Sequence, residues 1–348
     1  MNRKKASILL IYTGGTIGMK QDPVDGTLHP FDFSHIISEV PELSKFALKI
    51  DCHTFSPLID SSDVQPGLWK DIATLIGRKY DQYDGFVVLH GTDTMAYSAS
   101  ALSFMLENLS KPVVFTGSQL PIGALRTDGR ENLISAVEIA SAHDEEGNPM
   151  VPEVCIFFDY TLLRGNRATK VSSENFSAFR SPNLPPLAEA GISIRFNRPL
   201  IRRPGPEAPS LIVHRDLDTR VSILKIHPGL TPEVARYFLC SPGIRAVILE
   251  TYGSGNAPAK GWFPELVREA DRSGKLIVNV TQCLSGSVDM DLYATGKVLK
   301  DAGVVSGYDA TTEAMLSKLF YILALSPTKE DAKKLLEKNL RGEISKTL

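Results

Sequence analysis

The stretch Ser-Ile-Leu-Leu-Ile-Tyr-Thr-Gly-Gly-Thr-Ile-Gly, residues 7–18, decides which fold is expected of this chain. Its first six residues are almost wholly apolar, which is typical of a strand covered on both faces of a parallel sheet. Gly14 and Gly15 follow and allow a tight turn. Because open α/β sheets bind ligands outside the carboxyl ends of their strands, Thr16 stands where a reactive hydroxyl is expected.

The same turn admits two plainer interpretations. A strand followed by two glycines is also found in purely structural βα connections and in phosphate-binding loops. It matches neither GxGxxG nor GxxxxGK[ST], which argues against a nucleotide site. Taken alone, the turn leaves a structural and a catalytic role open.

Strand-like and helix-like segments alternate along the rest of the chain. Short apolar runs predict strands at 85–89, 112–116, 153–158, 221–226, 246–250 and 276–280. Helical periodicity predicts helices at 94–108 and at 128–140, the latter with Asp128 as its N-cap, and a polar helix from about residue 328. This alternation is the pattern of an α/β protein with a mainly parallel sheet.

Prolines divide the chain into two parts. Residues 196–212 are rich in proline and arginine, and proline neither continues a helix nor donates to a strand ladder. We therefore expect a larger N-terminal α/β domain over 1–195, a linker over 196–212 and a smaller C-terminal α/β domain over 213–348. The length of 348 residues agrees with two domains.

The composition argues against several classes of protein. A formal net charge of −2 disfavours a nucleic-acid partner, because phosphate binding depends on an excess of Lys and Arg. No stretch approaches the roughly 20 apolar residues of a membrane span, and the apolar run after the basic N-terminus is short for a secretory signal, so the cytoplasm is the expected location. No metal motif or nucleotide fingerprint calls for a cofactor. The four cysteines lack CxxC spacing and are expected to be reduced and mostly buried: Cys52, Cys155, Cys240 and Cys283.

A second polar cluster follows the strand predicted at 85–89. The segment His-Gly-Thr-Asp-Thr brings the Thr92 hydroxyl and the Asp93 carboxylate to the same edge of the sheet, where they suit nucleophilic attack or water activation and the binding of an ammonium. Lys170 is most simply a surface charge; if it lies near these two residues, it can lower the pKa of the threonine or carry its proton. His90 alone fits a packed histidine better than a catalyst.

Together these motifs resemble those of the bacterial L-asparaginases, and most of all their cytoplasmic type I branch. The resemblance covers essentially the whole chain. Its motifs are TGGTIG at 13–18, DSSD at 60–63, GFVVLHGTDTMAYSASALSFMLENL at 85–109, TGSQ at 116–119, RGNRATK at 164–170, SPNLPPL at 181–187 and YGSGNAP at 252–258.

The resemblance implies a mechanism. Thr16 would be the nucleophile that attacks the side-chain amide carbon of L-asparagine, which releases ammonia and leaves an aspartyl ester for water to hydrolyse to L-aspartate. Thr92, Asp93 and Lys170 would form a second cluster that positions or activates threonine and water. No metal or organic cofactor takes part.

The resemblance also implies how the substrate is held. Ser61, with Asp60 and Ser62 beside it, would bind the α-carboxylate, and Asp93 would pair with the α-ammonium. Backbone N–H groups near Gly15 and near the second threonine are the candidates for an oxyanion hole.

The chain departs from the family pattern in the loop after TGGTIG. Many members carry a tyrosine there as base or proton relay for the first threonine, but residues 19–33 contain none, and Thr27 stands roughly in its place. Tyr308 is the alternative that we consider, although a tyrosine after glycine ordinarily packs. The stretch Asp-Pro-Val-Asp-Gly in the same loop suggests a lid that closes over the substrate. The other polar candidates in the loop are Gln21, Asp22, Asp25 and His29.

The resemblance further implies a homotetramer made of tight dimers. Asn256 would complete the site of the neighbouring subunit, with a plain turn residue as the alternative. Type I members are often activated allosterically by asparagine, and the strand end at 281–283 is where such a site is expected.

Three other functions compete with an asparaginase. The missing extra domain and the charge balance disfavour an amidotransferase subunit that acts on glutamyl-tRNA. The missing signal peptide disfavours a secreted glutaminase-asparaginase. The presence of both threonines and Lys170 disfavours a catalytically silent amino-acid sensor.

Overall fold

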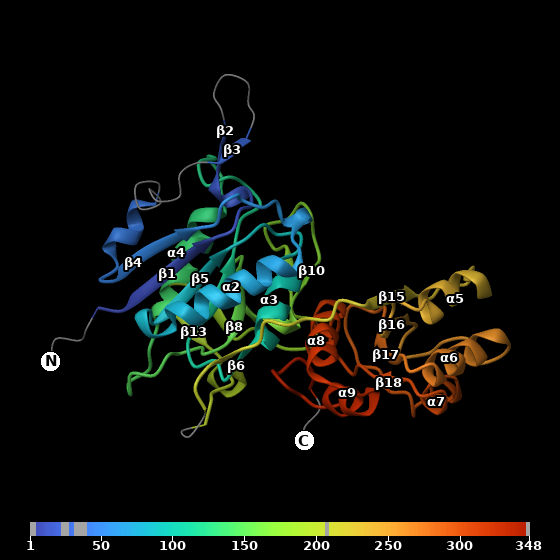
Figure 1. Ribbon diagram of the computed structural model, residues 1–348. Coiled ribbons are helices and arrows are strands. Elements are labelled where there is room, and N and C mark those ends of the chain that lie inside the picture. Colours follow the sequence, from blue (N-terminus) through green and yellow to red (C-terminus); the bar gives the residue numbers. More distant parts are fainter. Residues whose placement is uncertain (1–4, 22–27, 31–39, 206–208, 346–348) are drawn as a thin grey trace. The chain divides into compact units, whose positions relative to one another are not determined.

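The computed structural model describes residues 5–21, 28–30, 40–205 and 209–345. The chain divides into two compact units (Figure 1). The first comprises residues 1–181 and 185–215, and the second comprises residues 182–184 and 216–348. Both units are α/β, as the alternating sequence pattern predicts.

The first unit is built on an eight-stranded sheet. In spatial order its strands are β13 (Ile194–Phe196), β12 (Ala188–Ala190), β9 (Thr161–Arg164), β8 (Val154–Phe158), β7 (Val113–Thr116), β5 (Gly85–Leu89), β1 (Ser7–Tyr12) and β4 (Lys49–Thr54). The strands from β8 to β4 pair in parallel, and β9, β12 and β13 continue the sheet antiparallel. Strands β1, β5, β7 and β8 are buried along their whole length, which explains their nearly continuous apolar sequences.

The order of the parallel strands decides where a ligand can bind. Along the chain they follow as β1, β4, β5, β7 and β8, and in the sheet β1 lies between β4 and β5. This is the doubly wound 2-1-3-4-5 order, whose topological switch point lies between the first and third strands. Tyr12 at the end of β1 pairs with Leu89 at the end of β5. The turns that follow these two strands therefore flank the switch point.

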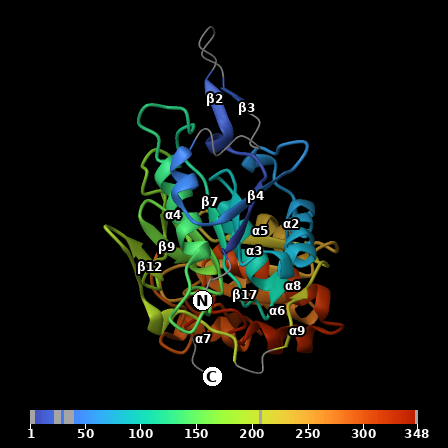
Figure 2. The same cartoon turned by 90° about the vertical axis from the view of Figure 1, so that its left-hand side faces the viewer.

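Helices cover both faces of this sheet. They are α2 (Pro66–Lys79), α3 (Met95–Met105) and α4 (Gly129–Ser141). Figure 2 shows α4 on one side of the strands and α2 and α3 on the other. Asp128 occupies the N-cap position of α4 but makes no side-chain capping bond, so the predicted cap is wrong. Its carboxylate instead accepts the backbone N–H groups of Gln119 and Leu120, while Thr127 Oγ1 accepts the Gly129 N–H at 2.9 Å.

Three two-stranded pairs accompany the large sheet. They are β2 (Met19–Gln21) with β3 (Leu28–Pro30), β6 (Leu106–Glu107) with β14 (Ile212–Val213), and β10 (Thr169–Lys170) with β11 (Phe179–Arg180). The β6–β14 pairing and a 2.6 Å contact between His214 Nε2 and Glu107 tie residues 212–214 to the first unit. The stretch expected to be a linker thus belongs to the first unit, which ends at Arg215.

The second unit is a parallel sheet of four strands that follow one another in chain order. These are β15 (Val221–Lys225), β16 (Ala246–Thr251), β17 (Leu276–Thr281) and β18 (Val305–Ser306). Its helices are α5 (Pro232–Cys240), α6 (Trp262–Arg272), α7 (Ala294–Asp301), α8 (Thr312–Leu325) and α9 (Lys329–Leu336). Helices α5 to α7 lie on one side of the strands, and α8 and α9 on the other (Figure 1). Apolar side chains from β15 to β17 and from α5 and α6 form the core.

In the described part of the chain, no helix is long and apolar enough to cross a membrane. None of the four cysteines forms a disulfide bond in the described residues, and only Cys155 is buried, so the expectation that most of them are buried is wrong. Cys52 is on the edge strand β4, Cys240 ends helix α5, and Cys283 is exposed in the loop after β17. These three places lack the cover that a central strand receives.

Candidate active site

The turn after β1 requires both of its glycines. Gly14 has φ 135° and Gly15 has φ 91°, values that L side chains rarely adopt. A Cβ atom on Gly14 would lie 2.2 Å from the Ile59 carbonyl oxygen, and one on Gly15 would lie 2.6 Å from the backbone nitrogen of Gly91. The turn is therefore fixed by close backbone contacts. It delivers Thr16 to the start of the short 3₁₀ helix η1 (Thr16–Gly18), where the residue is half-buried.

Three turns meet at this point. The close approach of Gly15 to Gly91 joins the turn after β1 to the turn after β5. A Cβ atom on Gly91 would lie 2.5 Å from Ser61 Oγ, which brings in the helix η4 (Ser61–Asp63). Thr94 Oγ1 donates to the Ser61 carbonyl oxygen at 2.6 Å and so locks the third turn in place. The glycine–threonine motifs, which lie far apart in the sequence, are thus neighbours.

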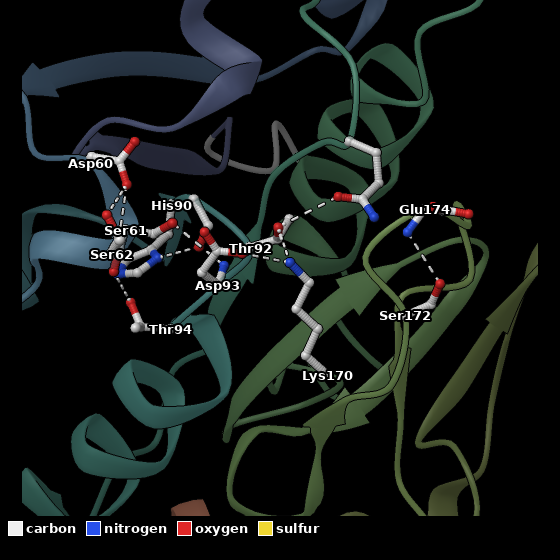
Figure 3. A network of polar contacts seen from close by, with 12 residues as sticks. Asp60, Ser61, Ser62, His90, Thr92, Asp93, Thr94, Lys170, Ser172 and Glu174 are labelled. Atoms are coloured by element: carbon white, nitrogen blue, oxygen red, sulfur yellow. Dashed lines mark hydrogen bonds and ion pairs between the residues drawn. The ribbon is translucent and has the colours of Figure 1, made fainter.

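The polar groups expected at the second motif lie together (Figure 3). Lys170 Nζ donates to Thr92 Oγ1 at 2.8 Å and to Asp93 Oδ1 at 2.7 Å. Strand β10 positions the lysine, whose side chain is 19% exposed, whereas the side chain of Asp93 is 60% exposed. The lysine amine is thus mostly screened from solvent, and the carboxylate is open to a ligand.

The threonine hydroxyl has a further partner that the sequence analysis did not name as a site residue. Thr92 Oγ1 donates to Gln119 Oε1 at 3.4 Å, and Gln119 Nε2 donates to the carbonyl oxygen of Asn175 at 3.1 Å. The half-buried Asp128 accepts the Gln119 backbone N–H, and desolvation raises the pKa of this carboxyl group. Gln119 ends the TGSQ motif after β7, so the rule that places ligands at carboxyl ends of strands would have pointed to it.

The DSSD turn is organised by its first residue. Asp60 Oδ1 accepts the Ser62 backbone N–H at 2.8 Å and the Ser62 hydroxyl at 2.7 Å. The backbone bond from Ser62 is the main reason why the pKa of Asp60 is lowered. Ser61, the next residue of the turn, is buried, and its Oγ lies 3.4 Å from the Asp93 backbone nitrogen. Asp60 therefore shapes the turn, and Ser61 borders the acid of the second motif.

His90 is a packed histidine, the interpretation that the sequence favoured. It is 1% exposed, and burial lowers its pKa to about 4. Both ring nitrogens have partners inside the unit, the Gly91 carbonyl oxygen at 2.7 Å and Ser98 Oγ at 2.9 Å. The ring cannot reach a substrate directly.

Two backbone donors and one hydroxyl of the site carry no hydrogen bond within the described residues. Among the residues that the structure describes, the backbone N–H groups of Gly15 and Thr92 meet no acceptor, and the Thr16 hydroxyl has no partner. Unpaired backbone donors are uncommon in folded proteins. Donors left available beside a free hydroxyl suit the stabilisation of a developing oxyanion.

Two residues expected at the site belong to the second unit. Asn256 closes a turn with Tyr252, and its Oδ1 accepts the Thr295 hydroxyl at 2.6 Å. Tyr308 has φ 54°; its N–H donates to Ser306 Oγ, and its carbonyl oxygen accepts the Val288 N–H. Their roles in the site stay predictions. The lid predicted after Gly18 falls largely on residues 22–27 and 31–39, outside the described part of the chain, and Thr27, Asp22 and Asp25 lie there.

The described residues contain no group of three His, Cys, Asp or Glu side chains that could hold a metal ion. What the described part of the first unit gathers is a free hydroxyl, two unpaired backbone donors, and a lysine ammonium that contacts both a threonine hydroxyl and a carboxylate. This set, at the switch point of a doubly wound sheet, defines the class of protein as an α/β enzyme arranged for nucleophilic attack on a small polar substrate.

Comparison with known proteins gives the family. The model of the asparaginase N-terminal domain matches residues 7–202, and that of the glutaminase/asparaginase C-terminal domain matches residues 220–336. The chain belongs to the asparaginase family. L-asparaginase 1 of Escherichia coli K12 is 47% identical over 349 residues, covering 98% of this chain and 99% of its own. The crystal structure of L-asparaginase I from Vibrio cholerae matches with a TM-score of 0.89 and 42% identity, covering 99% of this chain and 100% of its own.

A relative with another name shares the same sequence core. The 60 kDa lysophospholipase of Mus musculus is 45% identical over 363 residues, which cover 97% of this chain but 62% of that protein. The match thus leaves more than a third of that longer protein without a counterpart here.

Proposed function

We propose that this protein hydrolyses L-asparagine to L-aspartate and ammonia through a threonyl ester. The observation that carries the proposal is the meeting of the turns after β1 and β5, which places the turn of Thr16 against that of Thr92. High identity to L-asparaginase 1 over the full chain supports the same activity. A nucleophile, its assisting groups and backbone donors are then available without a cofactor.

The first half of the reaction uses the hydroxyl of Thr16. Its oxygen attacks the side-chain amide carbon of asparagine, and the negative charge that develops on the amide oxygen is stabilised by the backbone N–H groups of Gly15 and Thr92. The carbon–nitrogen bond then breaks, and the nitrogen leaves as ammonia after taking up the proton of the attacking hydroxyl. The product of this step is an aspartyl ester on Thr16.

The second half consumes water. A water molecule attacks the ester carbon, its proton returns to the threonine oxygen, and aspartate is released. Lys170 donates to Thr92 and to Asp93, so this cluster holds the second hydroxyl and the acid in fixed geometry beside the ester. We assign it the positioning and activation of water, and of the first threonine.

Recognition of the amino-acid part of the substrate uses the two other turns. The exposed carboxylate of Asp93 pairs with the α-ammonium, and Ser61 with Ser62 holds the α-carboxylate. Asp60 takes part by fixing the turn through Ser62. Glutamine is longer by one methylene, which a simple pocket discriminates by about 1–3 kcal/mol.

The deciding experiment measures ammonia release from asparagine and from glutamine by the wild type and by Thr16→Ala. An asparaginase releases ammonia from asparagine, and the variant does not. If the wild type releases ammonia from glutamine but not from asparagine, the protein is a glutaminase. If the wild type binds aspartate but releases ammonia from neither substrate, it is a sensor. Radiolabelled asparagine quenched in acid should leave label on the wild type and none on Thr16→Ala.

We also propose a homotetramer of tight dimers in which Asn256 completes the neighbouring subunit's site. Sedimentation equilibrium measures the assembly. Co-expression of Thr16→Ala and Asn256→Ala chains tests the sharing, because mixed dimers regain one intact site only if the two residues act across subunits. If the co-expressed mixture has no more activity than either parent variant, the proposal that subunits share their sites is contradicted.

Three finer assignments complete the proposal. Tyr308 serves as the proton relay in place of the family's lid tyrosine, so Tyr308→Phe lowers kcat far more than stability; unchanged kcat removes it from the mechanism. Asparagine activates the enzyme through the strand end at 281–283, which a sigmoidal dependence of velocity on asparagine tests, with hyperbolic kinetics of the tetramer as the contrary result. The location is the cytoplasm, checked by cell fractionation.

A further inference from the structure

A chain of three buried hydrogen bonds runs from helix α2 to the turn after β5. Trp69 Nε1 lies 2.8 Å from Ser98 Oγ, and Ser98 Oγ lies 2.9 Å from His90 Nε2. His90 Nδ1 lies 2.7 Å from the carbonyl oxygen of Gly91. All three side chains are at most 5% exposed. The chain ends on the peptide bond that joins Gly91 to Thr92.

The direction of this chain is fixed at both ends. The indole N–H of Trp69 can only donate, so Ser98 Oγ accepts it and turns its own proton to His90 Nε2. The Gly91 carbonyl oxygen can only accept, so His90 Nδ1 carries the ring proton. A neutral imidazole has one N–H, and burial, which lowers the pKa of His90 to about 4, keeps it neutral at pH 7. One tautomer satisfies every group.

This arrangement sets the orientation of the next N–H group. In a trans peptide the C=O and N–H bonds point to opposite sides. Since the Gly91 carbonyl is turned to the His90 ring, the Thr92 N–H points away from it. That N–H meets no acceptor in the described residues, and its turn lies against Gly15, the residue before Thr16.

We propose that His90 is a positioning residue: by holding the Gly91 carbonyl, it presents the Thr92 N–H to the oxygen of the reacting amide. The inference rests on the proposed function, because the donor needs an oxyanion to act on. His90 itself touches neither substrate nor reacting atoms.

The need for such a device follows from the glycine. Gly91 gives this peptide little torsional restraint, and rotation of the peptide plane would turn a carbonyl oxygen instead of an N–H towards the developing negative charge. Such a rotation replaces attraction by repulsion at the oxyanion, so it affects the transition state more than the bound substrate. Loss of the His90 bond should therefore lower kcat and leave KM unchanged.

Two substitutions separate this role from packing. In His90→Asn the side-chain amide reaches about the place of Nδ1 and can still donate to the Gly91 carbonyl, whereas in His90→Gln it reaches about the place of Nε2 and cannot. Both variants lose the ring, so the midpoints of their thermal unfolding serve as the control for packing. We expect kcat for asparagine to fall about tenfold in His90→Gln, with KM within about twofold, and to return to within about threefold of the wild type in His90→Asn.

The outcomes are distinct. Equal kcat in the two variants at similar stability would overturn the proposal, because His90 would then act only by filling space. A rise of KM with kcat unchanged would also overturn it. A wild type that releases no ammonia from asparagine would refute the proposed function, and the experiment on the tautomer, which needs no activity, would still decide whether the His90 bond exists.

That experiment uses the intact protein. Nitrogen-15 spectra of the histidine-labelled wild type distinguish a protonated Nδ1 from a protonated Nε2, and the His90 signals are identified by their absence in either variant. We expect a single neutral form with the proton on Nδ1 from pH 8 down to about pH 5. A proton on Nε2, or a mixture of the two forms, would contradict the proposed hydrogen bond to the Gly91 carbonyl whatever the activities of the two variants.

Discussion

The two units of this molecule treat the same local feature in opposite ways. Each has a parallel sheet with a glycine-rich turn after a buried strand, TGGT at 13–16 after β1 and YGSGN at 252–256 after β16. The first turn leaves a hydroxyl and an N–H group without internal partners in the described chain. The second is closed on itself: Tyr252 and Asn256 exchange backbone bonds, and Asn279 Nδ2 donates to the Gly255 carbonyl oxygen.

The cause of the difference lies in the order of the strands. In the first unit the strand order reverses between β1 and β5, so the turns that follow these two strands flank the switch point. In the second unit the four strands follow in sequence and no reversal occurs. Two threonine side chains beside the second turn form hydrogen bonds within the unit. Thr251 Oγ1 donates to Asn279 Oδ1 at 2.6 Å, and Thr281 Oγ1 donates to the Gly253 carbonyl oxygen at 2.6 Å. A glycine-rich turn indicates a catalytic site only where topology leaves its donors unused.

The largest effect that tests this comparison is expected from the same substitution in each unit. Thr16→Ala should lower kcat/KM for asparagine by about 10⁴-fold or more, because no other group replaces the nucleophile. Its free energy of unfolding should change by less than about 0.5 kcal/mol, since the hydroxyl has no partner among the described residues. Ammonia release and urea unfolding measure the two quantities.

Thr251→Ala is the matched control. This threonine is fully buried and bonded to Asn279, so its loss should cost about 1–3 kcal/mol of stability, with kcat/KM kept within about twofold. If Thr16→Ala were the variant that unfolds easily and Thr251→Ala the one that loses activity, the contrast between the two turns would be reversed.

The next effect concerns the glycines. Gly15→Ala places a methyl group 2.6 Å from the Gly91 backbone at φ 91°, so the two turns must separate. We expect about a hundredfold loss of kcat and a loss of stability of about 3 kcal/mol, because strain and a broken contact add. Activity assays and thermal unfolding check both.

Gly253→Ala provides the comparison in the second unit. Its φ is 50°, within the left-handed region that non-glycine residues sometimes occupy, and a methyl group there would have its nearest contact at 3.9 Å. A cost of about 1 kcal/mol is expected, with a loss of activity far smaller than that of Gly15→Ala. Comparable damage from both alanines would show that the close approach of Gly15 and Gly91 carries no special role.

Much of this fold follows from the sequence because buried parallel strands are continuous apolar runs. The segments 7–12 and 85–89 are strands at the predicted bounds, and 129–141 is a helix one residue off its prediction. The sequence also predicts that the two glycine–threonine turns meet, since both follow parallel strands. Backbone pattern alone therefore predicts the sheet and the edge at which ligands bind.

The parts that the sequence did not reveal depend on where a side chain turns. Asp128 is a residue type favoured at N-caps and stands directly before the helix, yet its carboxylate accepts the backbone N–H of Gln119. Only the three-dimensional course of that loop makes this N–H available. The reach of Gln119 to Thr92 and the Trp69–Ser98–His90 chain join residues from different elements. Such contacts leave no periodic signal in the sequence.

A smaller effect is expected from pH, because the first unit buries a titratable histidine. The pKa of His90 is about 4 in the fold and about 6.5 in an unfolded chain, so the unfolded chain takes up the proton first on acidification. The contribution of neutral His90 to the free energy of unfolding is about 3 kcal/mol. It is complete above pH 6.5 and is lost as the pH falls towards 4. In the second unit Arg220 and Arg245 lower the pKa of Asp218. The stability that the Asp218 carboxylate contributes is therefore lost only below about pH 4.

The two tryptophans allow the units to be followed separately, since Trp69 is in the first and Trp262 in the second. Urea unfolding of Trp262→Phe, which leaves Trp69 as the reporter, should show a free energy that falls between pH 7 and pH 5. The same protein carrying His90→Gln should show a much weaker fall. A fall of equal size in both proteins would assign the acid response to other groups.

The smallest effect probes how the second turn is closed. Thr295 Oγ1 donates to Asn256 Oδ1 at 2.6 Å, and Thr295→Val keeps the shape while it removes the donor. We expect a loss of about 1 kcal/mol, because a partly buried acceptor loses its partner, and Thr295→Ser should restore most of it. Urea unfolding of the three proteins gives the values. If valine and serine behaved alike, the closure of this turn would rest on its backbone bonds, and the contrast with the open turn after β1 would then be one of topology alone.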